Sequence, residues 1–254
     1  MRTAYLFDVD GTLTPSRCGM NGEFRIWFCE FMSNNDVFLV TGSDYGKTVE
    51  QLGTVITENV KRVYGCSGND VWQHGRNTYS SEWKLPDLAR TFLISCEYES
   101  PFEIRTGNHI EERPGVVNFS VVGRNATREE RAKYVEYDQA TGERNKIVQA
   151  FNTMFPDLTA TAGGETGLDI YPNGKDKAQI LDDFSEYDSI VFFGDRCDPQ
   201  GNDYTLARAV SELSQGKNSL AYGRGKFYNV EGWEDTWKIL QNNLQLVMRN
   251  RMAY

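Results

Sequence analysis

Short apolar runs followed by glycine or aspartate recur along the chain. The runs Thr3–Phe7, Val37–Thr41 and Ser189–Gly194 are rich in β-branched and aromatic residues and contain few polar ones. Strands of this kind are typical of a parallel sheet whose two faces are both covered by helices. The pattern therefore predicts an α/β fold with a Rossmann-like parallel sheet, in which ligands bind at the carboxyl ends of the strands.

Helical patterns lie between or after these runs. Asp44 is suited to cap a helix that passes through Lys47 and Leu52, because an aspartate side chain can accept from the free N–H groups of a first turn. The segments Lys177–Phe184 and Tyr204–Leu213 are further candidates. The alternation of strands and helices is that of a doubly covered sheet.

The middle of the chain follows a different pattern of helix, alternating strands, helices and strands. The segment Val116–Val122 alternates in part, and Thr127–Glu130 is a capping box that begins a charged amphipathic helix. We predict an α+β domain with an antiparallel sheet, covering residues 82–175. It is inserted into the α/β domain, which then comprises residues 1–81 and 176–254.

Composition and charge narrow the class of protein. The 254 residues include 39% hydrophobic and 25% charged residues, as in an ordinary globular protein. No apolar run approaches the ~20 residues that span a bilayer, and Met1–Phe7 is too short for a signal peptide. We expect a cytoplasmic protein without a membrane partner. The net charge of −9, with no basic tract, disfavours a nucleic-acid partner.

Cysteine and histidine residues give no sign of a zinc site. The chain has five cysteines, an odd number, and no two of them form a CxxC pair. We therefore expect reduced thiols. His74 and His109 lie far apart in the sequence and lack partner ligands. In an acidic chain of this kind, an anionic substrate requires a local cluster of arginine and lysine.

Two aspartates lie directly after the first predicted strand. Asp8 and Asp10 alternate in an extended chain, so both carboxylates can reach one small space. Neighbouring carboxylates repel and need a counter-charge, most simply Mg²⁺ with oxygen ligands. Gly11 and Thr12 suit a turn whose N–H groups face an anion. On its own the segment is also compatible with a structural metal loop or a plain acidic turn.

Three later segments favour phosphate chemistry, because each follows a predicted strand or begins the next helix. Thr41 and Ser43 offer hydroxyl groups for a phosphoryl oxygen. Lys177 offers an ammonium group that can neutralise a phosphorylated aspartate. Asp195 and Asp203 offer further oxygen ligands for a hard cation.

Taken together, these segments resemble the ordered motifs of the haloacid dehalogenase-like phosphotransferases. The resemblance implies that Asp8 attacks phosphorus and becomes an aspartyl phosphate. It implies that Asp10 acts as general acid and then as general base. It favours Lys177 over the nearby Lys175 as the catalytic lysine, because Lys177 matches the family position at the start of a helix. The Mg²⁺ ligands that it implies are Asp8, Asp10 through its backbone carbonyl, Asp195 and Asp203.

Longer segments resemble the eukaryotic-type phosphomannomutases, in order from residue 7 to residue 203. They are FDVDGTLTPSR, TGSDYGK, RPGVVNFSVVGR, REER, GGETGLDIYPNGKDK and FFGDRCDPQGND. This resemblance implies interconversion of mannose 6-phosphate and mannose 1-phosphate, with a hexose 1,6-bisphosphate as activator, on a route to GDP-mannose. The inserted segment is then the cap domain, and a homodimer through the cap is expected.

The arginines of the insert carry much of this resemblance. Arg113, Arg124 and Arg131 are separated by eleven and seven residues, which is the spacing of the family's cap arginines. Guanidinium groups bind phosphate bidentately. By the same resemblance, Arg17 matches a substrate-binding arginine of the core, and Asp169 matches a substrate-binding residue of the cap. A mutase requires two phosphate sites, because one phosphoryl group reacts while the other is held at a distance.

Three positions depart from the family pattern as we interpret it: Asp195, the segment Cys66–Gly68, and Gly167, which lacks a side-chain hydroxyl. A Mg²⁺-dependent sugar-phosphate phosphatase on the same scaffold is therefore the alternative. In that enzyme water, not a sugar, takes the phosphoryl group from Asp8. A non-catalytic protein that binds a metal or a phosphosugar is a third hypothesis, which the presence of Asp8, Asp10, Lys177 and Asp195 together disfavours.

Overall fold

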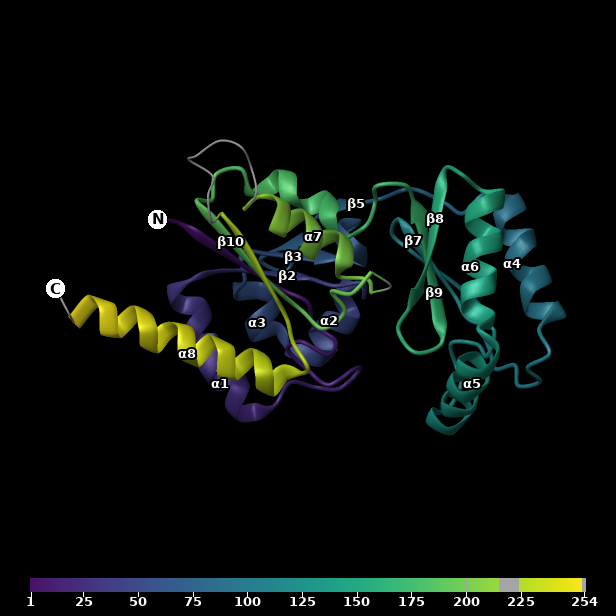
Figure 1. Ribbon diagram of the computed structural model, residues 1–254, viewed down its shortest axis with the longest axis horizontal. Coiled ribbons are helices and arrows are strands. Elements are labelled where there is room, and N and C mark those ends of the chain that lie inside the picture. The colour runs from purple at the N-terminus through teal and green to yellow at the C-terminus, as the bar shows by residue number, and fades with distance from the viewer. Residues whose placement is uncertain (200, 215–223, 253–254) are drawn as a thin grey trace.

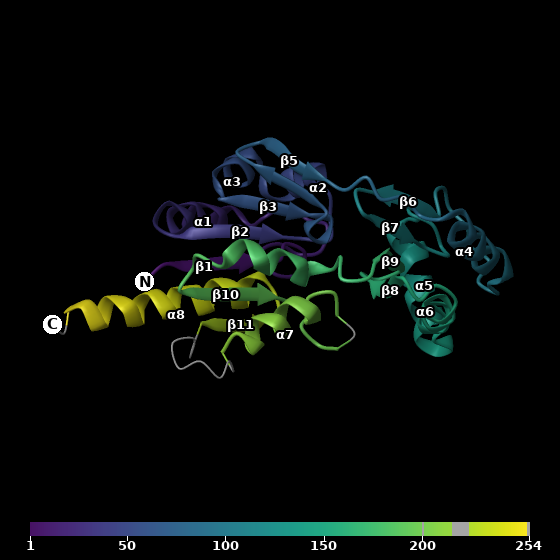
Figure 2. The same ribbon diagram turned by 90° about the horizontal axis from the view of Figure 1, so that it is seen from above.

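Two separate sheets organise the computed structural model, which describes residues 1–199, 201–214 and 224–252. The larger sheet has seven strands in the order β11-β10-β1-β2-β3-β4-β5, and the smaller has four in the order β6-β7-β9-β8. Figures 1 and 2 show each sheet with its own helices, and the two groups of elements lie side by side. The predicted fold class, an α/β core with an inserted α+β cap, is confirmed. The residue limits of the two domains stay a prediction.

The larger sheet is parallel except at one edge. Its five parallel strands are β11 (Gly225–Asn229), β10 (Ser189–Gly194), β1 (Thr3–Phe7), β2 (Asp36–Val40) and β3 (Arg62–Gly65). The antiparallel strands β4 (Asp70–Gln73) and β5 (Arg76–Ser80) extend the edge beyond β3.

Strand β1 lies at the centre of the parallel strands. Thr3 pairs with Ser189 of β10 and Ala4 pairs with Asp36 of β2, so the carboxyl ends of the three strands are nearly level. Residues that directly follow these strands therefore gather at one edge of the sheet.

Helices cover both faces of the larger sheet, as the continuous apolar runs predict. Phe7 packs on the face that carries α1 and α8, where its ring lies 4.9 Å from that of Phe193 and 5.3 Å from that of Phe28. The neighbouring Leu6 packs on the opposite face with η2 and α7. The helices of this part of the structure are α1 (Gly22–Asn34), α2 (Tyr45–Leu52), α3 (Thr54–Asn59), η2 (Lys177–Phe184), α7 (Tyr204–Glu212) and α8 (Trp233–Met252).

The smaller sheet is antiparallel and has helices on one face (Figure 1). Phe119 and Ile170 belong to the apolar core beneath these helices, whereas the alternate residues Asn118 and Asp169 line a pocket on the other face. The strands are β6 (Ile110–Arg113), β7 (Val116–Phe119), β8 (Leu158–Gly163) and β9 (Gly167–Pro172), and the helices are α4 (Asp87–Glu99), α5 (Arg128–Thr141) and α6 (Glu143–Met154).

Two predicted helix starts are confirmed at the level of individual hydrogen bonds. The Asp44 carboxylate accepts from the backbone N–H of Lys47 at 2.8 Å at the start of α2. At the start of α5, the Thr127 hydroxyl accepts from the N–H of Glu130, and the Glu130 carboxylate accepts from the N–H of Thr127. Each side chain satisfies an N–H group that has no partner within its helix.

Of two other predicted elements, one is confirmed as a helix and one is shorter than expected. The segment Lys177–Phe184 is a 3₁₀ helix. Residues three apart lie on the same side of such a helix, so Lys177 and Ile180 share one buried face. The strand predicted over Val116–Val122 ends at Phe119, because the chain then turns at Gly123, whose N–H donates to Ser120 O.

The larger and the smaller sheet, each with its helices, meet beside the end of β3. Cys66, which follows β3, packs with Val116 and Tyr171 of the smaller sheet. The Asn69 side chain donates to Lys175 O at 3.0 Å, and Arg113 Nη1 donates to Gly42 O at 3.2 Å. These contacts close one side of the pocket between the two sheets.

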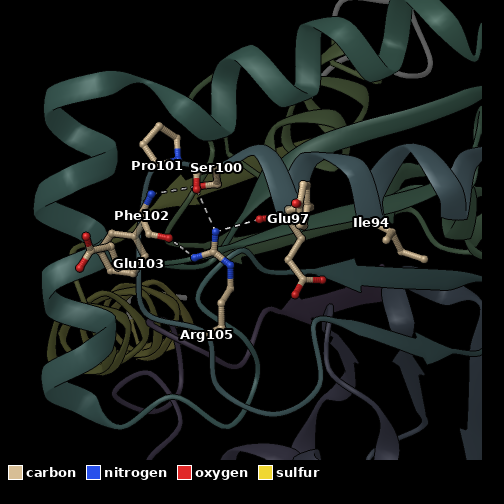
Figure 3. Close-up of a pocket in the computed structure, with 8 residues that line it drawn as sticks. Ile94, Glu97, Ser100, Pro101, Phe102, Glu103 and Arg105 are labelled. Carbon is tan, nitrogen blue, oxygen red and sulfur yellow. Dashed lines mark hydrogen bonds between the residues drawn. The ribbon is translucent and has the colours of Figure 1, made fainter.

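A hollow of about 510 Å³ lies at the C-terminal end of α4 (Figure 3). The Arg105 guanidinium points into it and donates to Glu97 O at 2.8 Å, to Ser100 O at 3.1 Å, and to Phe102 O. The last carbonyl groups of a helix have no partner within the helix. Arg105 therefore stabilises the end of α4. This structural role accounts for the position of Arg105 in the hollow without a bound ligand.

We expect Arg105→Ala to lower the free energy of unfolding by about 1–3 kcal/mol, because partly buried carbonyl groups lose a charged donor. Urea unfolding followed by circular dichroism measures this change. Arg105→Lys is the matched control, since it keeps the charge but cannot reach several carbonyl groups together. We expect an intermediate loss for it. If Arg105→Ala unfolds at the same urea concentration as the parent, water hydrogen-bonds these carbonyl groups as well as Arg105 does.

In the part of the chain that the structure describes, every helix is too short or too polar to cross a lipid bilayer.

Candidate active site

A pocket of about 870 Å³ lies between the two sheets and takes side chains from both. Its floor is formed by residues at the carboxyl edge of the larger sheet, and its roof by polar residues of the smaller one. The predicted site residues in its lining are Asp8, Asp10, Arg17, Thr41, Ser43, Arg113, Arg124, Arg131, Asp169 and Asp195.

The ends of the parallel strands position the floor. Asp8 directly follows β1, Thr41 follows β2, and Asp195 follows β10. Because these ends are nearly level, the three side chains meet at one edge. Gly11 allows the approach: its φ is +79°, and a Cβ there would lie 2.3 Å from Asp195 Oδ2.

A buried lysine lies between two of the aspartates. Lys177 Nζ is 2.5 Å from Asp8 Oδ1 and 2.6 Å from Asp203 Oδ1, and the side chains of Lys177 and Asp203 have no exposed surface. Burial alone would lower the pKa of Lys177, but Asp203 and Asp8 outweigh burial and raise it. The ammonium group therefore stays charged. Lys175, the rival candidate, is exposed.

Three carboxylates form a group that suits a hard cation. One oxygen from each of Asp8, Asp195 and Asp203 lies within 4.8 Å of the others. Lys177 offsets only part of their charge. Burial, followed by the Asp203 charge, raises the pKa of Asp195 to about 6. Burial also raises the pKa of Asp8, with further contributions from Asp203 and Asp195.

This excess of buried negative charge, on oxygen donors alone, fits Mg²⁺. Asp203 has less freedom than the other two carboxylates to take part, because Lys177 and the Arg196 N–H each bond one of its oxygens. The Asp10 carboxylate lies outside this acidic group among the residues described.

Asp10 is instead held by three donors. Its Oδ1 accepts from the Arg17 N–H at 2.6 Å and from Gln51 Nε2 at 2.9 Å, and its Oδ2 lies 3.5 Å from Ser43 Oγ. Gln51 is almost fully buried and also donates to Thr14 Oγ1 at 3.2 Å. Sequence reasoning missed Gln51, because it lies on α2, 41 residues from Asp10, with no motif around it.

The pocket roof brings together the three arginines of the insert. Arg113 and Arg124 both contact Glu111, and Arg131 pairs with Glu165 at 3.3 Å. The side chain of Arg131 is mostly buried, and its Nη1 has no partner among the described residues. A buried donor of this kind is costly unless a ligand accepts its hydrogen bond.

Arg17 reaches the same space from the floor. Burial lowers the pKa of its guanidinium, and the charges of Arg131 and Arg124 add to this effect. The backbone of Arg17 has a φ of +58°, which is unusual for a residue with a side chain. Guanidinium groups that repel one another across a pocket are stabilised by a shared anion.

The structure shows the surroundings of two positions that depart from the family pattern, Gly167 and the segment Cys66–Gly68. A Cβ at Gly167 would lie 2.8 Å from Asn118 Nδ2, so glycine makes room for the amide, which donates to Asp169 Oδ1 at 2.6 Å. Cys66 and Ser67 have φ values of +47° and +60°. Burial raises the pKa of the Cys66 thiol to about 12, so this thiol stays protonated.

Comparison with solved structures shows the fold. The C-terminal domain of a trehalose-6-phosphate phosphatase from C. albicans aligns with a TM-score of 0.63 at 15% identity, over 93% of this chain and 90% of that chain. A haloacid dehalogenase-like hydrolase from Bacteroides thetaiotaomicron aligns with a TM-score of 0.59 at 12% identity, over 95% and 99% of the two chains.

Comparison of sequences shows the family. The profile of the family described as eukaryotic phosphomannomutase matches residues 27–244. Phosphomannomutase from Saccharomyces cerevisiae is 33% identical, with 94% of this chain and 92% of that protein covered. Phosphomannomutase 1 from Homo sapiens is 35% identical over 81% and 83% of the two chains. The profile match and these relatives show that the chain belongs to the eukaryotic phosphomannomutase family.

Proposed function

We propose that this protein is a phosphomannomutase that interconverts mannose 6-phosphate and mannose 1-phosphate through an aspartyl phosphate and a hexose 1,6-bisphosphate. One observation carries the proposal: a single pocket has the aspartates on its floor and the insert's arginines on its roof. A mutase needs both, because its bisphosphate intermediate carries a phosphoryl group at each end.

Asp8 is the proposed nucleophile. Its Oδ1 is held by Lys177, which leaves Oδ2 to attack phosphorus. A P–O bond to Asp8 forms as the P–O bond to the sugar breaks, and Asp10 gives its proton to the departing sugar oxygen. In the reverse direction Asp10 takes the proton from a sugar hydroxyl, which attacks the phosphoryl group on Asp8.

Other floor residues support this transfer. Lys177 offsets the negative charge of Asp8, and the Thr41 and Ser43 hydroxyl groups can donate to phosphoryl oxygens. Mg²⁺ bound by Asp8, Asp195 and the Asp10 carbonyl, near Asp203, would screen the charge of the phosphoryl group. We propose that Asp203 acts chiefly by holding Lys177 in place.

The arginines Arg113, Arg124 and Arg131 are proposed to bind the second phosphoryl group, with Arg17 and Asp169 contacting the same ligand. The buried and unpartnered Nη1 of Arg131 supports this assignment. When the bisphosphate turns around, its two phosphoryl groups exchange sites. The mannose 1-phosphate produced feeds GDP-mannose synthesis in the cytoplasm.

A homodimer through the cap is also proposed. Helix α4 lies on the outer side of the smaller sheet (Figures 1 and 2) and exposes Ile94 and Tyr98, one turn apart, by 51% and 89%. Light scattering of the purified protein gives the mass that tests this assembly.

One assay separates the mutase from a phosphatase. Mannose 1-phosphate is incubated with the protein and Mg²⁺, with and without glucose 1,6-bisphosphate, and both mannose 6-phosphate and free phosphate are followed. We expect mannose 6-phosphate to form and the bisphosphate to accelerate its formation. Release of free phosphate as the main product would identify a sugar-phosphate phosphatase instead.

Replacing Arg131 by Ala tests the second phosphate site. Each charge-assisted hydrogen bond contributes about 1.5–3 kcal/mol, so bisphosphate binding should weaken by roughly one to two decades. Isothermal titration calorimetry with glucose 1,6-bisphosphate in EDTA, which prevents Mg²⁺-dependent turnover, measures the dissociation constant. Arg128→Ala, an exposed position on the same helix, is the matched control. Equal binding by both variants contradicts the assignment.

A further inference from the structure

Glu111 lies between two of the arginines in the pocket roof and contacts both. It is on β6, two residues before Arg113, so the two side chains share one face of the strand. Its Oε1 accepts from Arg113 Nε at 3.3 Å, and its Oε2 accepts from Arg113 Nη2 at 3.2 Å. Oε2 also accepts from Arg124 Nε at 2.5 Å. One carboxylate thus joins guanidinium groups from two different segments.

This carboxylate is ionised and partly shielded from water. Burial alone would raise the pKa of Glu111, but its hydrogen bond to Arg113 and the charges of Arg113 and Arg124 outweigh burial and lower it. The side chains of Arg113 and Arg124 are 13% and 19% exposed, and that of Glu111 is 32% exposed. Ion pairs in such positions are screened less than those on an open surface.

The atoms that Glu111 leaves free are the ones that a phosphate needs. It occupies the Nε of each arginine and one Nη of Arg113. Arg113 Nη1 donates to Gly42 O, and neither Nη of Arg124 has a hydrogen-bond partner within the residues described. Both side chains line the pocket. Both Nη groups of Arg124 are therefore available to a bound anion, and each Nη of Arg113 keeps one further N–H to donate, because a guanidinium has five N–H donors. The Nε edges are fixed.

We propose that Glu111 is a positioning residue, which holds Arg113 and Arg124 in the orientation that binds the second phosphoryl group of a sugar bisphosphate. The proposal rests on the proposed function, because it assumes that the arginines bind that group. A long, flexible arginine loses conformational freedom on binding, and an arginine that is already ordered loses less. Glu111 therefore strengthens anion binding although it carries a negative charge.

The opposite expectation follows from charge alone. A carboxylate beside the arginines lowers the local positive potential and competes with phosphate, so its removal should tighten binding. Glu165 offers a matched control, because it also pairs with an arginine of the pocket. Among the residues described it forms one ion pair, with Arg131 Nη2 at 3.3 Å, and its side chain is 63% exposed. Exposed pairs of this kind order their partners little.

The experiment compares Glu111→Gln with Glu165→Gln in the full-length protein. Each variant loses one negative charge beside an arginine of the pocket. Calorimetry with glucose 1,6-bisphosphate in EDTA gives the dissociation constants. We expect Glu111→Gln to bind about tenfold more weakly than the parent, as for the loss of one charge-assisted contact, and Glu165→Gln to bind equally or more tightly. Tighter or unchanged binding by Glu111→Gln overturns the proposal.

Steady-state kinetics separate positioning from a general loss of structure. In Glu111→Gln the KM for mannose 1-phosphate should rise by about tenfold, while kcat at saturation stays within about twofold of the parent, because the floor residues are unchanged. A fall in kcat with an unchanged KM contradicts the positioning role. Thermal unfolding monitored by circular dichroism shows whether the variant is folded.

Two further variants cover the remaining outcomes. Glu111→Asp keeps the charge but withdraws the carboxylate by one methylene, and we expect intermediate binding. If it binds as the parent does, the position of the carboxylate is unimportant and the proposal fails. Arg124→Ala tests the assumed site itself. If Arg124→Ala binds the bisphosphate more weakly and Glu111→Gln does not, the proposed role of Glu111 is wrong but the second phosphate site stands. If Arg124→Ala binds as the parent does, the second phosphate site itself is wrong.

Discussion

Asp8→Asn is expected to abolish turnover while the fold is retained. The amide is a poor nucleophile, so no aspartyl phosphate can form, and we expect a loss in kcat of roughly 10⁴-fold or more. The amide oxygen can still accept the hydrogen bond that Asp8 Oδ1 receives from Lys177 at 2.5 Å, so the buried cluster stays paired. The measurement is the conversion of mannose 1-phosphate with Mg²⁺ and glucose 1,6-bisphosphate.

Transfer of label gives a second and more direct readout. Bisphosphate carrying ³²P should label the parent protein transiently and leave Asp8→Asn unlabelled. Asp157→Asn, an exposed position in the turn before β8, is the matched control and should be labelled normally. If Asp8→Asn keeps a tenth or more of the parent activity, another residue is the nucleophile.

Lys177→Met is expected to affect both activity and stability. Methionine is similar in length but leaves the buried carboxylates of Asp8 and Asp203 without their counter-charge. Removing one partner of a buried ion pair typically costs about 3–5 kcal/mol. Urea unfolding in EDTA measures the loss. Lys175→Met, which changes an exposed lysine of the same segment, should unfold as the parent does.

The loss in Lys177→Met should depend on pH. The pKa of Asp8 is already raised in the folded parent, and without Lys177 it should rise further. For a carboxyl group whose pKa is raised by folding, stability falls as pH rises from the unfolded pKa to the folded pKa, because over that range the folded state holds a proton that the unfolded state has lost. The variant should therefore be destabilised more at pH 8 than at pH 5. Equal destabilisation at both pH values would falsify the view that uncompensated carboxylates cause the loss.

The parallel strands and helix caps were predictable because their signals are local. The run Thr3–Phe7 is β1 to the residue, and Asp44 and Thr127 cap the helices that follow them. These features depend on apolar continuity or on a side chain near its own backbone, and both are visible in the sequence. The residues that follow the strands could be placed at one edge for the same reason.

Contacts between distant segments could not be predicted in this way. Gln51 reaches Asp10 only because α2 packs beside the loop after β1, and Glu111 joins Arg124 only because β6 and the turn after β7 are neighbours. Neither residue lies in a motif. Whether Lys177–Phe184 forms an α or a 3₁₀ helix likewise depends on packing against the sheet rather than on local propensity.

The hydrogen bond from Arg113 to Gly42 O has a consequence for which sugars the pocket accepts. Gly42 separates Thr41 from Ser43 on the floor, while Arg113 belongs to the roof, so in the proposed mutase this bond would help to set the distance between the two proposed anion sites. A fixed span acts as a length gauge. We therefore expect a bisphosphate built on a shorter carbon chain than a hexose to reach only one of the proposed sites and to lose the gain in affinity from engaging both together.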